Sequence, residues 1–119
     1  MAEKNLIIEN GKITNTMLGY EDHGILTIWL YLTMDGSGIG YGGYCLDAYD
    51  EEQKKRVGTA YGLGCIVGIL KTLEIDRWEY IPGTYIRIEH EGWGGKVVRI
   101  GHIIKDQWFS FSTVSHEKR

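Results

Sequence analysis

The sequence contains few of the residues that build cysteine or metal sites. It has only two cysteines, Cys45 and Cys65, with no CxxC spacing. Isolated cysteines argue against a disulfide framework and predict free thiols that act as small buried hydrophobic residues. The four histidines show no HExxH or other ligand spacing, so no metal site and no cofactor are predicted.

Long apolar runs and excess positive charge are also missing. The longest apolar runs, such as residues 25–32, are far shorter than the ~20 residues that span a bilayer. The first residues lack the apolar core of a signal peptide. A formal charge of −3 opposes binding to nucleic acid, which depends on cations that neutralise phosphates. We therefore expect a cytoplasmic protein that binds neither nucleic acid nor membrane.

What is present suits one globular domain. The chain has 119 residues, of which 43% are hydrophobic and 24% charged. A chain of this size supports one core but not two. We expect a single domain over residues 1–114 and a frayed tail over 115–119.

Period-two patterns predict most of the sheet. Residues 25–34 place Leu26, Ile28 and Leu30 on one face and aromatic or hydroxyl side chains on the other. Asn10-Gly11 is a strong hairpin signal between a strand at residues 6–9 and its partner at 12–18. Further strands are predicted over residues 39–46, 85–89, 97–104 and 108–111, with a glycine-rich turn at 92–95. The charged segment 47–56 is expected to be a solvated loop or a lead-in to a helix.

Apolar residues at helical spacing predict one long helix over residues 59–74, with Thr59 as N-cap. Residues 60–70 carry no charge, and Gly62, Gly64 and Gly68 weaken the helix unless another backbone approaches closely. A homodimer packed helix against helix would explain both features, and so would loops of the same chain. The expected fold is thus α+β, an antiparallel sheet of about five to six strands with one long central helix, in a homo-oligomer.

Two local motifs have competing interpretations. Residues 38–43 match G-x-G-x-x-G, but a strand-like segment follows, whereas a dinucleotide fingerprint opens a helix. This pattern favours a glycine-rich strand that a ligand or neighbouring backbone can approach. At the start of the helix, the amides near Gly58 and Thr59 suit either an anion or ordinary capping.

Aromatic rings and cations together suggest a nucleotide-binding protein. Rings can stack on a base, and guanidinium or ammonium groups can hold its phosphates. The alternative is that the rings form the core and the cations lie in solvent, and composition alone leaves both open. No nucleophile, base and orienting group occur in a diagnostic motif, so no catalytic residue is predicted. The candidate ligand-binding residues are Trp29, Tyr44, Tyr61, Trp108, Arg87, Arg99, Lys105, His23, His102, Gly58 and Thr59.

Four segments resemble a widespread family of small phage and prophage proteins: residues 16–25, 42–47, 58–62 and 100–109. By size, source and ring-and-cation chemistry, the chain is similar to the phage sponges of the Sequestin and Lockin type, which inhibit Thoeris defence. The resemblance implies a homodimer or higher homo-oligomer in the cytoplasm of an infected bacterium. It also implies an anti-defence protein that sequesters an ADP-ribose-derived signal, such as a cyclic ADP-ribose isomer or an ADP-ribose conjugate, without cleaving it.

Two other functions are compatible with the sequence. A protein-binding inhibitor of a host defence enzyme would use the ring-bearing face of residues 25–33. A phosphodiesterase-like enzyme that degrades the signal would use His23 and His102 as general acid and base.

Overall fold

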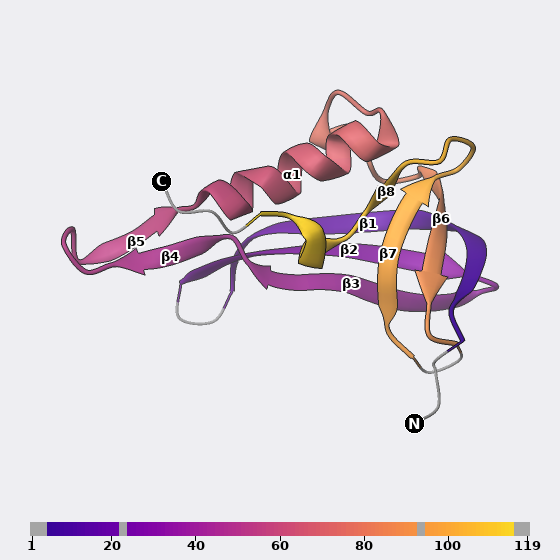
Figure 1. Cartoon of the computed structure of the whole chain (residues 1–119), viewed down its shortest axis with the longest axis horizontal. Helices are drawn as coiled ribbons and strands as arrows, with labels where there is room; N and C mark the ends of the chain where they lie inside the picture. Colours follow the sequence, from indigo (N-terminus) through magenta and orange to yellow (C-terminus); the bar gives the residue numbers. More distant parts are fainter. Residues whose placement is uncertain (1–4, 22–23, 93–94, 116–119) are drawn as a thin grey trace.

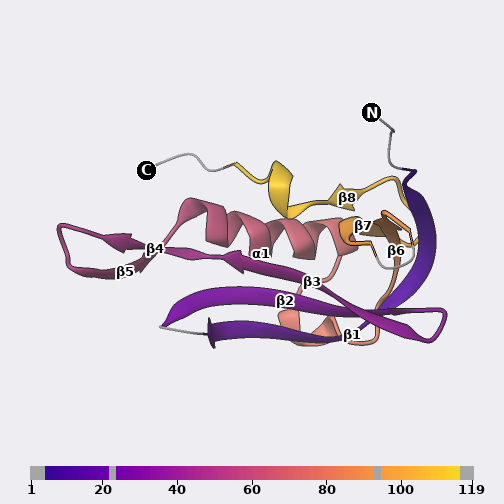
Figure 2. The ribbon, with the colours of Figure 1, turned by 90° about the horizontal axis from the view of Figure 1, so that it is seen from below.

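A six-stranded antiparallel sheet packs against one long helix (Figures 1 and 2). The structure, a computed structural model, describes residues 5–21, 24–92 and 95–115. The strand order is β3-β2-β1-β6-β7-β8, which confirms the α+β class and the predicted antiparallel sheet. The strands are β1 (Ile7–Glu21), β2 (Ile25–Met34), β3 (Ser37–Cys45), β6 (Tyr85–His90), β7 (Val97–His102) and β8 (Trp108–Phe109).

Alternation along β2 sets the core. Ile28, Leu30 and Leu32 are buried, as the period-two pattern predicts. Trp29 and Tyr31 lie on the other face, where their rings stack nearly parallel. The core is completed by residues of α1 (Ala60–Leu73) and of the other strands, among them Tyr61, Cys65, Ile69, Ile86, Ile88 and Ile100.

The predicted hairpin at Asn10-Gly11 is wrong, because β1 runs without a turn from Ile7 to Glu21. Its first half pairs with β6 and its second half with β2. A Cβ atom at Gly11 would lie 2.4 Å from Ile88 Cδ1 and 2.7 Å from the carbonyl oxygen of Thr33. Glycine is therefore needed here because the Ile88 side chain on one neighbouring strand and the Thr33 carbonyl on the other both approach closely. Pairing with these strands overrides the local tendency of Asn-Gly to form a turn.

The expectation of a loop or helix lead-in at residues 47–56 is also wrong. This segment forms a separate two-stranded hairpin of β4 (Asp47–Asp50) and β5 (Lys55–Gly58). The carboxylate of Asp50 accepts the amides of Glu52 and Gln53 and closes its turn. The hairpin extends beyond the N-terminal end of α1 in both views (Figures 1 and 2).

Helix α1 is confirmed, and Thr59 caps it by accepting the amide of Gly62 at 2.9 Å. The close approach that its glycines require comes from the chain itself. A Cβ atom at Gly62 would meet the Leu46 carbonyl, one at Gly64 would meet Val114, and one at Gly68 would meet Phe109. The glycines therefore give no support to a dimer, which stays a prediction.

Short 3-10 turns follow the helix at η1 (Trp78–Tyr80) and end the described chain at η2 (Phe111–Thr113). No helix in the described part of the chain is both long and apolar enough to cross a membrane. His23, the middle of the predicted turn at 92–95 and most of the predicted tail lie outside the described residues.

Candidate functional site

Three of the predicted residues meet on the outer face of β6, β7 and β8. Arg87 and Arg99 place their guanidinium carbons 4.7 and 4.1 Å from the ring centroid of Trp108. A Cβ atom at Gly101 would lie 2.6 Å from this ring, so the glycine lets the indole lie over β7. We call Arg87, Glu89, Arg99 and Trp108 the Trp108 cluster.

Arg87 is the fixed member of the Trp108 cluster. Its Nε donates to the carbonyl oxygen of His102 at 2.8 Å, and its Nη2 donates to that of Lys105 at 2.6 Å. Carbonyl oxygens carry no formal charge, so they hold the guanidinium in place without neutralising it.

Arg99 is the accessible member of the Trp108 cluster. Its Nε donates to Glu89 Oε1 at 2.5 Å, and Glu89 faces it directly across the strand pair. The Arg99 side chain is 38% exposed and that of Glu89 is 12% exposed. The two terminal nitrogens of Arg99 make no hydrogen bond to any residue that the structure describes, so these donors remain available to a ligand.

Lys105 and His102 lie next to this cluster and meet the C-terminal end of α1. Lys105 Nζ lies 2.8 Å from Glu74 Oε2, and this hydrogen bond holds the pKa of Glu74 below its usual value. His102 Nδ1 accepts the amides of Ile104 and Lys105, so its Nε2 carries a proton. His102 therefore shapes its loop, and Nδ1 is not available as a general base.

The charges of this region are balanced. The three cations Arg87, Arg99 and Lys105 lie near three carboxylates. Glu89 pairs with Arg99, Glu74 pairs with Lys105, and Asp106 accepts a hydrogen bond from Trp108 Nε1 at 2.8 Å. Balanced charge gives little long-range attraction for an anion. Binding here would depend on direct contacts with the free donors of Arg99.

The remaining predicted residues lie elsewhere. Tyr61 is buried and donates to the carbonyl oxygen of Phe111, while Tyr44 stacks on the Phe111 ring at 4.5 Å. Burial also raises the pKa of Tyr61. Gly58 and Thr59 lie at the other end of the 14-residue helix from Lys105, about 21 Å away along its axis. One pyrophosphate therefore cannot contact both ends, as the residue list from the sequence would require.

Trp29 explains the glycine-rich motif of β3. Cβ atoms at Gly40 and Gly43 would lie 3.1 and 2.8 Å from its ring, so these glycines make room for the indole. Its Nε1 donates to Glu21, and its ring stacks on Tyr31. The close approach predicted for this strand is thus made by a side chain of the neighbouring strand.

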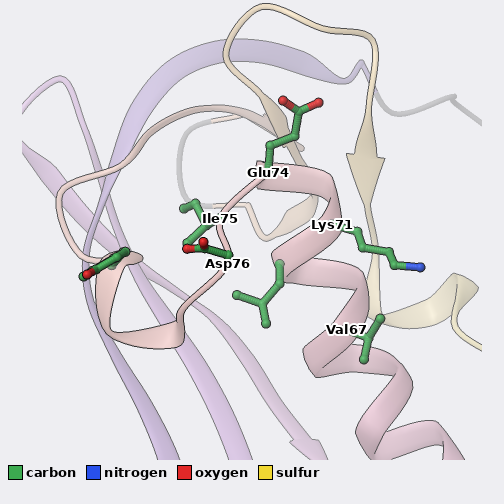
Figure 3. A pocket seen from close by; sticks show the side chains of 7 residues that line it. Val67, Lys71, Glu74, Ile75 and Asp76 are labelled. Atoms are coloured by element: carbon green, nitrogen blue, oxygen red, sulfur yellow. The ribbon is translucent and has the colours of Figure 1, made fainter.

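A groove that no sequence pattern predicted lies beside the C-terminal half of α1 (Figure 3). Its volume is about 670 Å³, and it lies between the helix and the segment that leads into η1. Such a groove forms only when that segment folds back along the helix, so one-dimensional patterns do not reveal it. Its lining residues are Val67, Leu70, Lys71, Glu74, Ile75, Asp76 and Tyr80.

A buried histidine lines a second depression at the joined ends of β1 and β6. His90 Nδ1 accepts the amide of Gly92, so its Nε2 donates to Glu9 Oε2 at 2.8 Å. Because both ring nitrogens are hydrogen-bonded within the chain, this pair ties the two strand ends together.

Nothing in the described residues gathers three His, Cys, Asp or Glu side chains that could hold a metal ion. Comparisons of the chain with protein-family models, curated proteins and solved structures find no match.

Proposed function

We propose that the protein is a non-enzymatic binding protein that captures an ADP-ribose-derived nucleotide signal at the Trp108 cluster, as a phage anti-defence sponge does. One observation carries the proposal: among the residues that the structure describes, the terminal nitrogens of Arg99 have no hydrogen-bond partner, and they lie beside an aromatic ring and a second, fixed guanidinium. Cations next to an aromatic ring match a ligand that combines phosphates with a base.

The phosphates would bind to Arg99 first. Its terminal nitrogens can hold a phosphate in a bidentate manner while Nε keeps its bond to Glu89. Arg87 adds a positive charge whose position is set before the ligand arrives, which lowers the entropy lost on binding. Lys105 can join by exchanging the exposed carboxylate of Glu74 for a phosphate oxygen.

Capture without turnover needs only complementarity and a prepared surface. The two described histidines near candidate sites, His90 and His102, use their Nδ1 atoms as acceptors of backbone amides. For His102 this leaves Nδ1 unavailable as a general base, while His23, the other histidine of the phosphodiesterase alternative, lies outside the described residues. Trp29 and Tyr31 stack over the glycines of β3, and Tyr31 is still 39% exposed, so this face stays compatible with the alternative of a protein-binding inhibitor.

The test is calorimetric titration of the protein with ADP-ribose and with cyclic ADP-ribose isomers. Arg99→Ala should weaken binding by about 1.5–3 kcal/mol, roughly ten- to a hundredfold, because it removes a charge-assisted bidentate contact. The matched control is Arg77→Ala, since Arg77 also lies over an aromatic ring, that of Tyr80, but outside the Trp108 cluster. The control should leave affinity unchanged.

Two further measurements decide between the functions. Heat denaturation of the loaded protein followed by mass spectrometry should return the ligand intact, whereas a hydrolysis product would indicate an enzyme. No heat of binding with any of these nucleotides would overturn the proposed function. Equal affinity in wild type and Arg99→Ala would instead move the site away from the Trp108 cluster.

A further inference from the structure

Helix α1 presents an apolar stripe to solvent. Leu63 is 64% exposed and Val67 is 39% exposed, and their spacing of four residues places them on one helix face. Leu70 continues this row but packs partly against the core. The opposite face is packed in the core through residues such as Cys65 and Ile69. The stripe is thus a second apolar surface of the helix, separate from the one that the sheet covers.

The stripe and the groove make this surface complementary to itself. Leu63 protrudes four residues before Val67, and the groove opens on the same helix face from Val67 onward. When two such helices run antiparallel around a two-fold axis at Val67, Leu63 of each copy lies opposite Lys71 of the other, at the groove. In an isologous interface, each residue of one copy meets the same partner residue of the other copy in both directions. Leu63 and the groove at Lys71 are equally far from Val67, so the protruding side chain of each copy meets the groove of the other.

We propose that a second copy of this chain docks on this surface, with α1 antiparallel to its counterpart and Leu63 inserted into the partner's groove. The proposal stands on other residues than the Trp108 cluster and does not depend on its ligand. The proposed dimer also uses a different face of the helix from the one that the sequence predicted. The face that carries Gly64 and Gly68 is covered by Val114 and Phe109, and the proposed contact is made by the face that carries Leu63.

Charge complementarity supports a second copy as the occupant. Asp76 and Glu74 place carboxylates on the rim of the groove at the C-terminal end of α1. The β4–β5 hairpin extends past the N-terminal end of the same helix (Figures 1 and 2), and its turn exposes Lys54 and Lys55 beside Glu51 and Glu52. In the proposed antiparallel pair, a hairpin lysine of each copy would pair with Asp76 of the other, while Glu74 keeps its bond to Lys105.

The helix dipole favours the same arrangement. The first turn of α1 contains no acidic residue, so the positive end of its dipole has no carboxylate of its own. Antiparallel packing brings Glu74 of one copy close to that end of the other, which is a favourable placement. The hairpin also gains a neighbour, since a two-stranded hairpin alone is only marginally stable.

Sedimentation equilibrium tests the proposal directly. The wild type should show twice the 13.5 kDa mass of the chain, and Leu63→Asp should raise the dimer dissociation constant at least about a hundredfold, because it places an unpaired charge in an apolar contact. The matched control is Leu6→Asp, which changes a 48% exposed leucine just before β1 and should leave the dimer intact. A wild type that stays monomeric at about 100 µM, far above the dissociation constants of specific dimers, overturns the proposal.

A charge exchange tests the orientation of the two copies. Asp76→Lys and Lys55→Asp should each weaken the dimer, and the double variant should recover most of the loss, because the two charges meet only between copies. Two single variants whose effects add without recovery would contradict the antiparallel arrangement. Calorimetry separates this proposal from the proposed function. If monomeric Leu63→Asp still binds ADP-ribose, binding at the Trp108 cluster does not need the dimer. If the wild type forms a dimer but binds no ADP-ribose, the proposed function is wrong and the dimer is unaffected.

Discussion

Replacing Gly11 by alanine should destabilise the protein through a steric conflict at the centre of the sheet. The new methyl group would meet Ile88 Cδ1 at 2.4 Å and the Thr33 carbonyl oxygen at 2.7 Å. Ile88 is buried and Thr33 belongs to the paired strand β2, so neither can move away freely. Overpacking of this kind costs about 1–3 kcal/mol, and the lower entropy of the unfolded alanine chain offsets about 0.4–1 kcal/mol.

The net loss should therefore be about 1–2 kcal/mol in the free energy of unfolding, with a Tm lowered by several degrees. Urea denaturation followed by circular dichroism measures it. Gly58→Ala is the matched control, because a Cβ atom at Gly58 of strand β5 meets nothing within 4 Å. This control should be neutral or slightly stabilising.

A double-mutant cycle with Ile88→Val identifies the cause. Valine lacks the Cδ1 atom that Gly11→Ala would strike, so the two substitutions should be less destabilising together than the sum of their separate effects, by at least about 0.5 kcal/mol. If Gly11 were instead in an Asn-Gly turn, its side-chain position would face solvent and the two changes would add. Strict additivity would refute the continuous strand.

Two other substitutions test local features of the fold. Thr59→Ala removes the N-cap bond to Gly62 and should lower the free energy of unfolding by about 1 kcal/mol in urea, whereas Thr59→Ser should retain most of it; an unchanged alanine variant would contradict the cap. The Arg56 guanidinium holds the pKa of Asp47 below its usual value, so the stability from this pair is complete above about pH 4 and is lost as pH falls through the lowered pKa. Asp47→Asn should therefore lower Tm at pH 7, with a difference from wild type that narrows below about pH 4, and a difference constant with pH would refute this origin.

Patterns that depend on one element were predictable from the sequence. Alternation gave the buried face of β2, and Thr59 with the apolar repeat gave the start of α1. The turn predicted at Gly11 is wrong because β6, a strand distant in sequence, pairs with β1 at Gly11, and the pairing with β2 begins at the next residue. The segment 47–56 failed because its charges were assigned to solvent, while Asp50 uses its carboxylate to close a hairpin turn.

The site was predictable only as a set of residue types. Arg87 and Arg99 were placed on neighbouring strands, and the structure brings both against Trp108. The direct pairing of Arg99 with Glu89 depends on the strand register, which one sequence does not fix. The sequence pattern does not show how far apart the candidate residues lie in space. Thr59 and the end of α1 that Lys105 contacts are roughly 21 Å apart along the helix axis.

The shared strand β1 has a consequence for the order in which the chain folds. Strands β1, β2 and β3 are consecutive in sequence and pair through short connections, so this meander forms from local contacts as soon as residues 7–45 are available. The edge of β1 that receives β6 then waits for residues 85–90 to be synthesised. During that interval the first half of β1, which contains Ile7 and Ile8 and pairs with β6 and not with β2, has no strand partner. Unpaired strand segments of this kind can associate with other chains, and docking of β6 removes that opportunity.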